Sequence, residues 1–199
     1  MTVRANKPEF NFREKLKELD YSHLPYDKIQ PGGVVQMISK EWPHSGSANE
    51  SETSSSSYQP TNFNIVIYPK FINSLIRITT NPNIKNNGGS NYHNLAIYRS
   101  INDGPWEYAP NPNSTSNGLV TYRFNGLSLY YDNVPLDMFD RPNTTGKVEY
   151  KVYHRNSGGN YTVRVGENGA YEYMCATEIR QGIKEDGDWW LEFLMFFKF

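Results

Sequence analysis

The chain has 199 residues, of which 37% are hydrophobic, 21% are charged and 15% are aromatic, and its formal net charge is -1. A chain of this length can bury one substantial core, so we expect one main domain. The balanced charge lacks the basic excess that binds a phosphate backbone, and it argues against nucleic acid as a partner.

Residues 1–30 differ from the rest because a helical pattern occurs only here. In NFREKLKELD an Asn cap is followed three positions later by Glu, and one helix face carries Phe12, Leu16 and Leu19. A helix of about nine residues is too short to persist alone in water. We therefore expect an attachment arm that docks through these three side chains on another protein. Folding back onto the parent domain is the alternative.

From Val34 onward the pattern alternates with period two, which is typical of strands that turn one face toward a core. The clearest segments place these residues on one face: Phe63, Ile65 and Ile67 in the first, and Val148, Tyr150, Val152 and His154 in the second. Turn-rich connectors join the strands, and no helical crossover intervenes. Residues 31–199 therefore predict an all-β fold, an antiparallel jelly-roll-like β-sandwich.

The segment YEYMCATEI also alternates. It predicts a strand with Tyr171, Tyr173 and Cys175 on one face and Glu172 and Glu178 on the other. We expect the cysteine to point inward, where a thiol behaves as a small hydrophobic group.

The chain ends in DWWLEFLMFFKF, which is apolar on both faces of a strand. Such a strand must be covered on both faces. It is either a central strand of the chain's own sandwich or an interface with other copies or another protein, and we favour the interface. The interface candidates are Trp189, Trp190, Leu191, Phe193, Phe196, Phe197 and Phe199. The run is about half the roughly 20 residues that span a bilayer, so we expect no membrane insertion.

No pattern of catalytic or metal-binding residues occurs in the sequence. The four histidines, at positions 23, 44, 93 and 154, are scattered singly, and no Cys/His cluster has metal-ligand spacing. We expect no metal, no cofactor and no enzymatic activity. Four carboxylates, Asp132, Asp137, Asp140 and Glu149, could supply a glycosidase-like pair across a groove, but we favour solvated surface charge.

Two aromatic residues lie in a connector that is rich in Pro and Asn. The segment PWEYAPNPN contains Trp106 and Tyr108, and aromatic faces beside amides are suited to sugar contact. The alternative is that Trp106 plugs the end of the sandwich or packs on a neighbouring subunit. Trp106 and Tyr108 are our candidates for glycan contact, and we expect the loops that carry them and Tyr58 to face outward.

Several segments resemble, in order, a β-sandwich module of tail-fibre and other virion proteins of marine bacteriophages. They are PGGVVQ, SSSSYQP leading to NFNIVIYPKFINSLIRIT, PLDMFDRPNTTGKVEYKVYHRN, and CATEIRQ, with residues 144–152 as the closest match. NKPEFNFREKLKELD resembles an N-terminal leader of cyanophage structural proteins. Departures from the module are Leu75 in place of a lysine, a long 102–117 segment, and the tail after Gln181.

The resemblance implies a non-enzymatic virion component that is commonly trimeric and is assembled in the host cytoplasm. We expect a fibre or appendage protein anchored by residues 1–30, whose partners are copies of itself and other virion proteins. One alternative is a capsid decoration (cement) protein. A second alternative is a carbohydrate-binding or depolymerising module.

Overall fold

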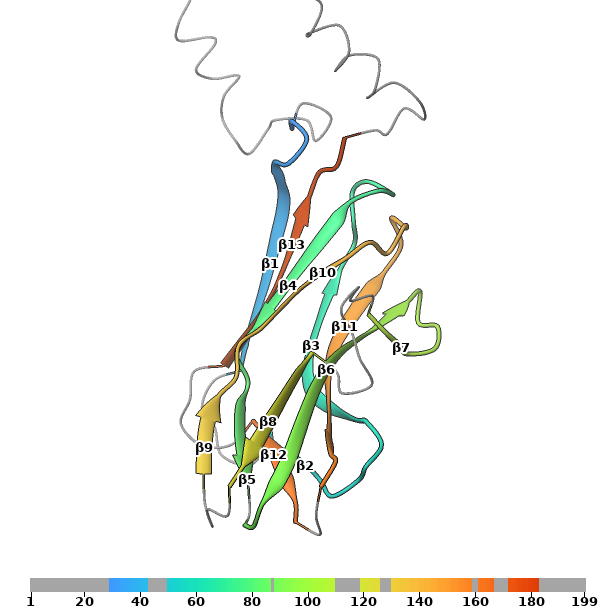
Figure 1. Cartoon of the computed structure of the whole chain (residues 1–199). Coiled ribbons are helices and arrows are strands. Elements are labelled where there is room, and N and C mark those ends of the chain that lie inside the picture. The colour runs from blue at the N-terminus through green and yellow to red at the C-terminus, as the bar shows by residue number, and fades with distance from the viewer. Residues whose placement is uncertain are drawn as a thin grey trace, which may run out of the picture.

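The computed structural model describes residues 29–42, 50–86, 88–109, 119–125, 130–158, 161–166 and 172–182 (Figure 1). Every regular element in this part of the chain is a β-strand. The strands are β1 (Val34–Trp42), β2 (Ser51–Thr53), β3 (Gln59–Ile67), β4 (Leu75–Thr80), β5 (Asn83–Asn86), β6 (Asn91–Ile101), β7 (Glu107–Tyr108), β8 (Val120–Phe124), β9 (Tyr130–Asn133), β10 (Leu136–Asp140), β11 (Val148–Asn156), β12 (Val163–Val165) and β13 (Glu172–Ile179). The predicted arm residues Phe12, Leu16 and Leu19, and the apolar run from Trp189 to Phe199, lie outside the described residues.

All strand pairs are antiparallel, and they form two layers. One layer contains the sheet β3-β11-β6-β7, with β8 pairing the remaining length of β6. The other contains two shorter sheets, β1-β13-β4-β10 and β2-β12-β5-β9. These two sheets have the same order of chain segments, since β2 follows β1, β5 follows β4, β10 follows β9 and β13 follows β12. They are successive halves of one four-strand layer (Figure 1).

Two prolines mark the interruption of that layer. Pro82 separates β4 from β5, and Pro135 separates β9 from β10. Proline has no N–H to donate to a ladder, so it is expected where regular pairing stops. The Val134 amide instead donates to the Pro82 carbonyl at 3.0 Å, which joins the two breaks.

Eight strands result when each interrupted strand is counted once and β7 and β8, which pair with successive lengths of β6, are counted together. The interrupted layer then has the order one, eight, three, six, and the layer that contains β3 and β11 has the order two, seven, four, five. Two layers of four interleaved strands are the jelly-roll architecture. The expected all-β, antiparallel, jelly-roll-like sandwich is therefore confirmed.

The predicted alternation is confirmed in β3 and β11. Phe63, Ile65 and Ile67 are buried, and so are the inward residues of β11 from Val148 to His154 at every second position. All of these side chains except His154 belong to one continuous hydrophobic cluster between the layers. Burying each large apolar side chain stabilises the fold by roughly 1.5–3 kcal/mol.

The predicted phase of β13 was wrong. Glu172 and Glu178 are buried with Met174 and Ala176, while Tyr173 is exposed and Cys175 is half-buried. The two inward-facing glutamates are tolerated in the interior because backbone and side-chain groups donate hydrogen bonds to their carboxylates. Glu178 Oε1 accepts the amides of Lys70 and Phe71 at 2.8 and 3.2 Å and the Ser74 hydroxyl at 2.5 Å.

A buried polar bridge joins the two layers. Asp140, on β10, accepts a hydrogen bond from the Arg99 guanidinium at 2.5 Å and another from the Tyr150 hydroxyl at 2.8 Å. The Asp140 side chain is fully buried and that of Arg99 is 14% exposed. Both donors come from the opposite layer, so this carboxylate fixes how the layers meet.

The chain enters and leaves the sandwich at one end. The Gly32 amide donates to the Arg180 carbonyl at 2.7 Å, and the Arg180 amide donates to the Gly33 carbonyl at 2.9 Å. These residues extend β1 and β13, whose ends lie side by side at the top of Figure 1.

Candidate functional site

Five aromatic side chains gather on the outer face of the sheet β3-β11-β6-β7. We call this surface the aromatic face, and it consists of Tyr58, Tyr98, Trp106, Tyr108 and Tyr153. Its origin is the alternation in β11, where Val152 and His154 point inward and Tyr153 therefore points outward. Strand pairing places Tyr98, on β6, opposite Tyr108, on β7.

The rings of the aromatic face pack in one connected chain. Tyr98 stacks on Tyr153 with centroids 4.2 Å apart and planes inclined by 30°. Tyr108 meets Tyr98 edge-on at 5.6 Å, and Tyr58 lies 5.8 Å from Tyr98. Trp106 contacts Tyr153 at 5.9 Å. Stacked and edge-to-face pairs, such as Tyr98 with Tyr153 and with Tyr108, each stabilise by about 0.5–1.5 kcal/mol beyond their buried area.

Two cations cover parts of the aromatic face. Lys151 Nζ lies 4.5 Å from the centroid of the Trp106 ring, and Arg155 Cζ lies 4.7 Å from that of Tyr58. Lys151 also lies 3.8 Å from Glu149, which accepts a hydrogen bond from the Asn64 amide at 2.7 Å. The rim therefore offers charged and amide groups beside half-buried rings.

Burial raises the pKa values of three hydroxyls of the aromatic face. It raises the pKa of Tyr58 to about 12, and it is also the main cause of the raised pKa values of Tyr98 and Tyr153. The Tyr108 hydroxyl is buried and has no hydrogen-bond partner among the described residues. The ring faces can contact the apolar face of a saccharide, and the charged and amide groups of the rim can bond to its hydroxyls.

The structure brings together the three aromatic residues that the sequence pointed to. Trp106, Tyr108 and Tyr58 come from two separate connectors and belong to one surface. Sequence reasoning missed Tyr98 and Tyr153, which join them. Their outward phase was readable from the alternation of each strand, but the pairing of β6 with β11 was not.

The four candidate carboxylates have separate partners. Asp137 pairs with Arg77 at 2.6 Å, Asp132 accepts the Tyr122 hydroxyl at 2.6 Å, and Glu149 contacts Lys151. The interpretation as solvated surface charge was wrong for Asp140, which is buried in the bridge between the layers. It was wrong because the sequence does not reveal that Arg99 and Tyr150 face this position.

Two of the four histidines form a buried pair. His93 Nε2 lies 3.1 Å from His154 Nδ1, and both side chains are almost fully buried. Burial lowers the pKa of His93 well below its usual value and that of His154 to about 4, so both imidazoles are neutral at pH 7. Among the described residues, no group of three or more His, Cys, Asp or Glu is placed to hold a metal ion.

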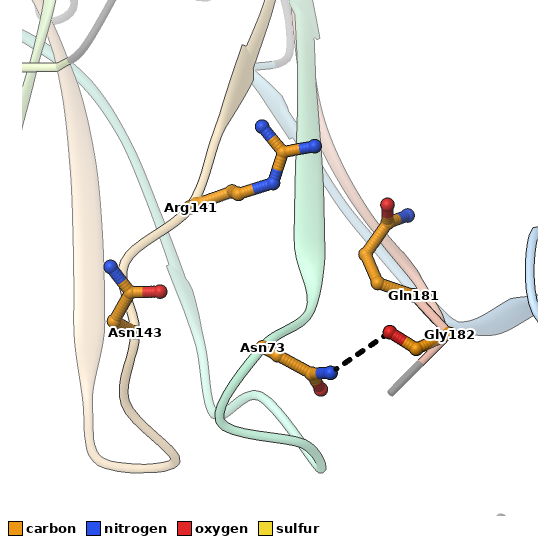
Figure 2. A pocket seen from close by; sticks show the side chains of 5 residues that line it. All are labelled: Asn73, Arg141, Asn143, Gln181 and Gly182. Carbon is orange, nitrogen blue, oxygen red and sulfur yellow. Dashed lines mark hydrogen bonds between the residues drawn. The ribbon is translucent and has the colours of Figure 1, made fainter. Parts of the chain in front are cut away.

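An open pocket of about 430 Å³ lies at the end where the chain enters and leaves the sandwich. We call it the end pocket, and its lining is Asn73, Arg141, Asn143, Gln181 and Gly182. Figure 2 shows Arg141 and Asn143 on one side and Gln181 and Gly182 on the other, with Asn73 between them. The Asn73 amide donates to the Gly182 carbonyl at 3.4 Å.

In the described ranges, no helix has the length and apolarity needed to cross a membrane.

No family model and no curated protein matches the chain. Among solved structures, it is similar to a chain of infectious bursal disease virus strain Gx, with 12% identity and a TM-score of 0.37 over 75% of this chain and 37% of that one. It is also similar to a chain of strain Gt, with 12% identity and a TM-score of 0.24 over 74% of this chain and 38% of that one. The chain thus spans well under half of either. A likeness of this size supports no functional conclusion, so function is inferred from the chain's own residues.

Proposed function

We propose that the chain is a non-enzymatic structural protein of a phage virion, anchored through its N-terminal arm and displaying an oligomeric jelly-roll body as part of a fibre or other appendage. The resemblance to virion β-sandwich modules motivates this proposal. The strand order supports it, because viral capsid and lectin domains use the same double-sheet architecture.

The observation that carries the proposal is that the chain enters and leaves the sandwich side by side. Residues 32–33 and Arg180 are joined by two backbone hydrogen bonds at the end of β1 and β13. The arm of residues 1–30 and the apolar run that begins at Trp189 are therefore both connected to this end. Attachment and assembly at one end leave the faces of the sheets available for display.

The aromatic face is the surface that we assign to host contact. It lies on the outer side of β6 and β11 and combines half-buried rings, neutral phenols and a polar rim. Saccharide rings stack on such surfaces through their apolar faces while their hydroxyls bond to the rim. The chain would then work by anchoring and adhesion, as a trimer.

Cryo-electron microscopy of the particle, with the copy number measured by quantitative mass spectrometry, tests the virion role. We expect dozens of copies or fewer on projecting structures. Hundreds of copies between capsomers would indicate a cement protein instead, and absence from the particle would refute both roles. Deletion of residues 1–24 should abolish incorporation and leave a folded oligomer, so incorporation of this variant at normal copy number would contradict anchoring by the arm.

A further inference from the structure

An amine and a carboxamide from the two layers meet at the border of the sandwich. Lys40, on the edge strand β1, donates a hydrogen bond through Nζ to Oδ1 of Asn64, on the edge strand β3, at 2.7 Å. The two residues are 24 positions apart along the chain. Because β1 pairs with β13 and β3 pairs with β11, this contact joins the borders of two different sheets.

The edge of the core directs the lysine toward the amide. Lys40 has the same phase in β1 as the buried Trp42, whose ring packs on Phe63 with centroids 4.7 Å apart. Lys40 Nζ lies 4.8 Å from the centroid of the Trp42 ring. A lysine stem packs along apolar surface while its head group stays in water, so the ring guides Nζ around the border of β3 to Asn64.

A carboxylate contacts the nitrogen of the same amide. Asn64 Nδ2 donates to Glu149 Oε1 at 2.7 Å. Strand pairing fixes this contact, because Asn64 lies opposite Lys151 and Glu149 precedes Lys151 by two residues on the same face of β11. Lys147 Nζ and Lys151 Nζ each lie 3.8 Å from an oxygen of Glu149, whose side chain is 17% exposed. We call Lys40, Asn64 and Glu149 the border cluster.

The border cluster contains the reactants and the proton carrier of an amide exchange. A neutral lysine amine is a nucleophile, and the Asn64 oxygen already accepts a hydrogen bond from Lys40 Nζ, which polarises the carbonyl. Glu149 contacts the nitrogen that has to leave. Well-oriented groups on one molecule react with effective molarities of about 10⁵–10⁸ M, so a carboxamide that is inert toward a dissolved amine can react here.

We propose that Lys40 and Asn64 form an intramolecular isopeptide bond with Glu149 as the proton carrier. The exposed Lys40 ammonium first loses a proton to water. Nζ then attacks Cγ of Asn64, and a bond forms between these two atoms. Glu149 takes a second proton from Nζ and passes it to Nδ2. The bond between Cγ and Nδ2 breaks, and the nitrogen leaves as ammonia, which binds the proton released at the start. One amide replaces another, so no oxidant or further reactant is consumed.

The bond ties the two layers together covalently. It closes the loop between residues 40 and 64, and such a link stabilises a protein mainly by restricting the unfolded chain. We expect the linked chain to melt on the order of 10 °C above an unlinked variant. The reaction occurs once per molecule, so it agrees with a structural protein, and it does not depend on the proposed virion function.

Mass spectrometry of the purified full chain tests the proposal. The intact mass should be one ammonia below the sequence mass. Trypsin should fail to cut after Lys40, which leaves residues 29–70 as one peptide with the same deficit. A protease specific for Glu should then release residues 29–41 still joined to residues 53–70. An ammonia deficit without this joined pair, as a succinimide at an Asn-Gly step would give, would refute the bond.

The pH dependence of the reaction is a second test. Only the neutral amine attacks, so any unlinked fraction should convert at least tenfold faster at pH 9 than at pH 7. A chain that keeps its full sequence mass after prolonged incubation at pH 9 would overturn the proposal and leave the contacts of the border cluster as ordinary hydrogen bonds.

Three variants assign the roles within the border cluster. Lys40→Arg retains the charge and a donor to Asn64 but lacks the amine, so it should keep the full sequence mass and the lower melting temperature. Glu149→Gln can still accept the bond from Nδ2 but cannot carry a proton, and it should link at least tenfold more slowly. Lys151→Arg changes the other lysine beside Glu149, and as the matched control it should link normally.

The opposite results are equally informative. An ammonia deficit in Lys40→Arg would show that a different group reacts, and linking of Glu149→Gln at the wild-type rate would refute the role of Glu149. Circular dichroism of each variant establishes that it is folded before its mass is compared with that of the wild type.

Discussion

His93 Nε2 and His154 Nδ1 lie 3.1 Å apart in the space between the two layers, on neighbouring strands β6 and β11. Burial lowers the pKa of His154 to about 4 from its usual 6.5. The unfolded chain therefore binds more protons than the folded chain between pH 4 and 6.5. The contribution of His154 to the free energy of unfolding is present above pH 6.5 and is lost as the pH falls through 4.

We expect the free energy of unfolding to rise with pH across this window in a variant in which Glu172 no longer titrates. Urea denaturation of Glu172→Gln at half-unit pH intervals measures it, and a flat profile would contradict a neutral buried pair.

Glu172 has the opposite pH dependence. Burial raises its pKa to about 7 from 4.5, although its carboxylate accepts the Asn83 amide at 2.7 Å. Here the folded chain binds the extra proton, so the stabilisation is present below pH 4.5 and is lost as the pH rises through 7. Glu172→Gln can still accept the same hydrogen bond. It should be more stable than the wild type at pH 8, by on the order of 2 kcal/mol, and close to it at pH 4. A constant difference at both pH values would show that the carboxyl is not desolvated.

Two aspartates on β10 provide a matched comparison of buried and exposed ion pairs. Asp140→Ala leaves the Arg99 guanidinium and the Tyr150 hydroxyl without their buried acceptor, and we expect a loss of about 3–5 kcal/mol. Asp137→Ala removes a partner of Arg77 that is 48% exposed, and we expect a loss of no more than about 1 kcal/mol. Chemical denaturation of both variants gives the difference. Similar losses would mean that Asp140 does not join the layers.

Two substitutions on the aromatic face distinguish a role in glycan binding from a role in stability. Tyr153 is 9% exposed and contacts both Tyr98 and Trp106, so Tyr153→Ala should cost about 3–5 kcal/mol of stability. Trp106→Ala removes a half-buried ring at the rim and should cost less, about 1–2 kcal/mol, because more of that ring is already in water. If the face binds saccharides, Trp106→Ala should lose its signals on a glycan array while remaining folded. Retention of every wild-type signal would leave Trp106 with a packing role.

Much of the fold was predictable because alternation is a local property. Apolar residues alternate with polar ones in residues 63–67 and 148–154, and the structure buries the expected faces. β13 was read in the wrong phase because its inward face contains Glu172 and Glu178. These glutamates can be buried because Asn83 donates to Glu172 and residues that follow β3 donate to Glu178. The donors lie about 90 to 108 positions away along the chain.

The candidate sites were harder to predict for the same reason. Trp106 and Tyr108 were noticed because they stand in one short connector, and Tyr58 because of its type. The stack of Tyr98 on Tyr153 arises from pairing between strands some 55 residues apart, which no local pattern encodes. The end pocket takes its lining from three separate segments, so Arg141 looked like any other surface cation.

The proline interruptions have a consequence for how crowded copies of this chain behave. Pro82 and Pro135 split the four-strand layer, so its border at β9 and β10 consists of segments of four and five residues instead of one long ribbon. A strand of a neighbouring molecule could pair with this border over only a few residues, because Pro135 has no N–H to donate and regular pairing stops there. The interruption therefore disfavours edge-to-edge aggregation of this layer when the protein is concentrated.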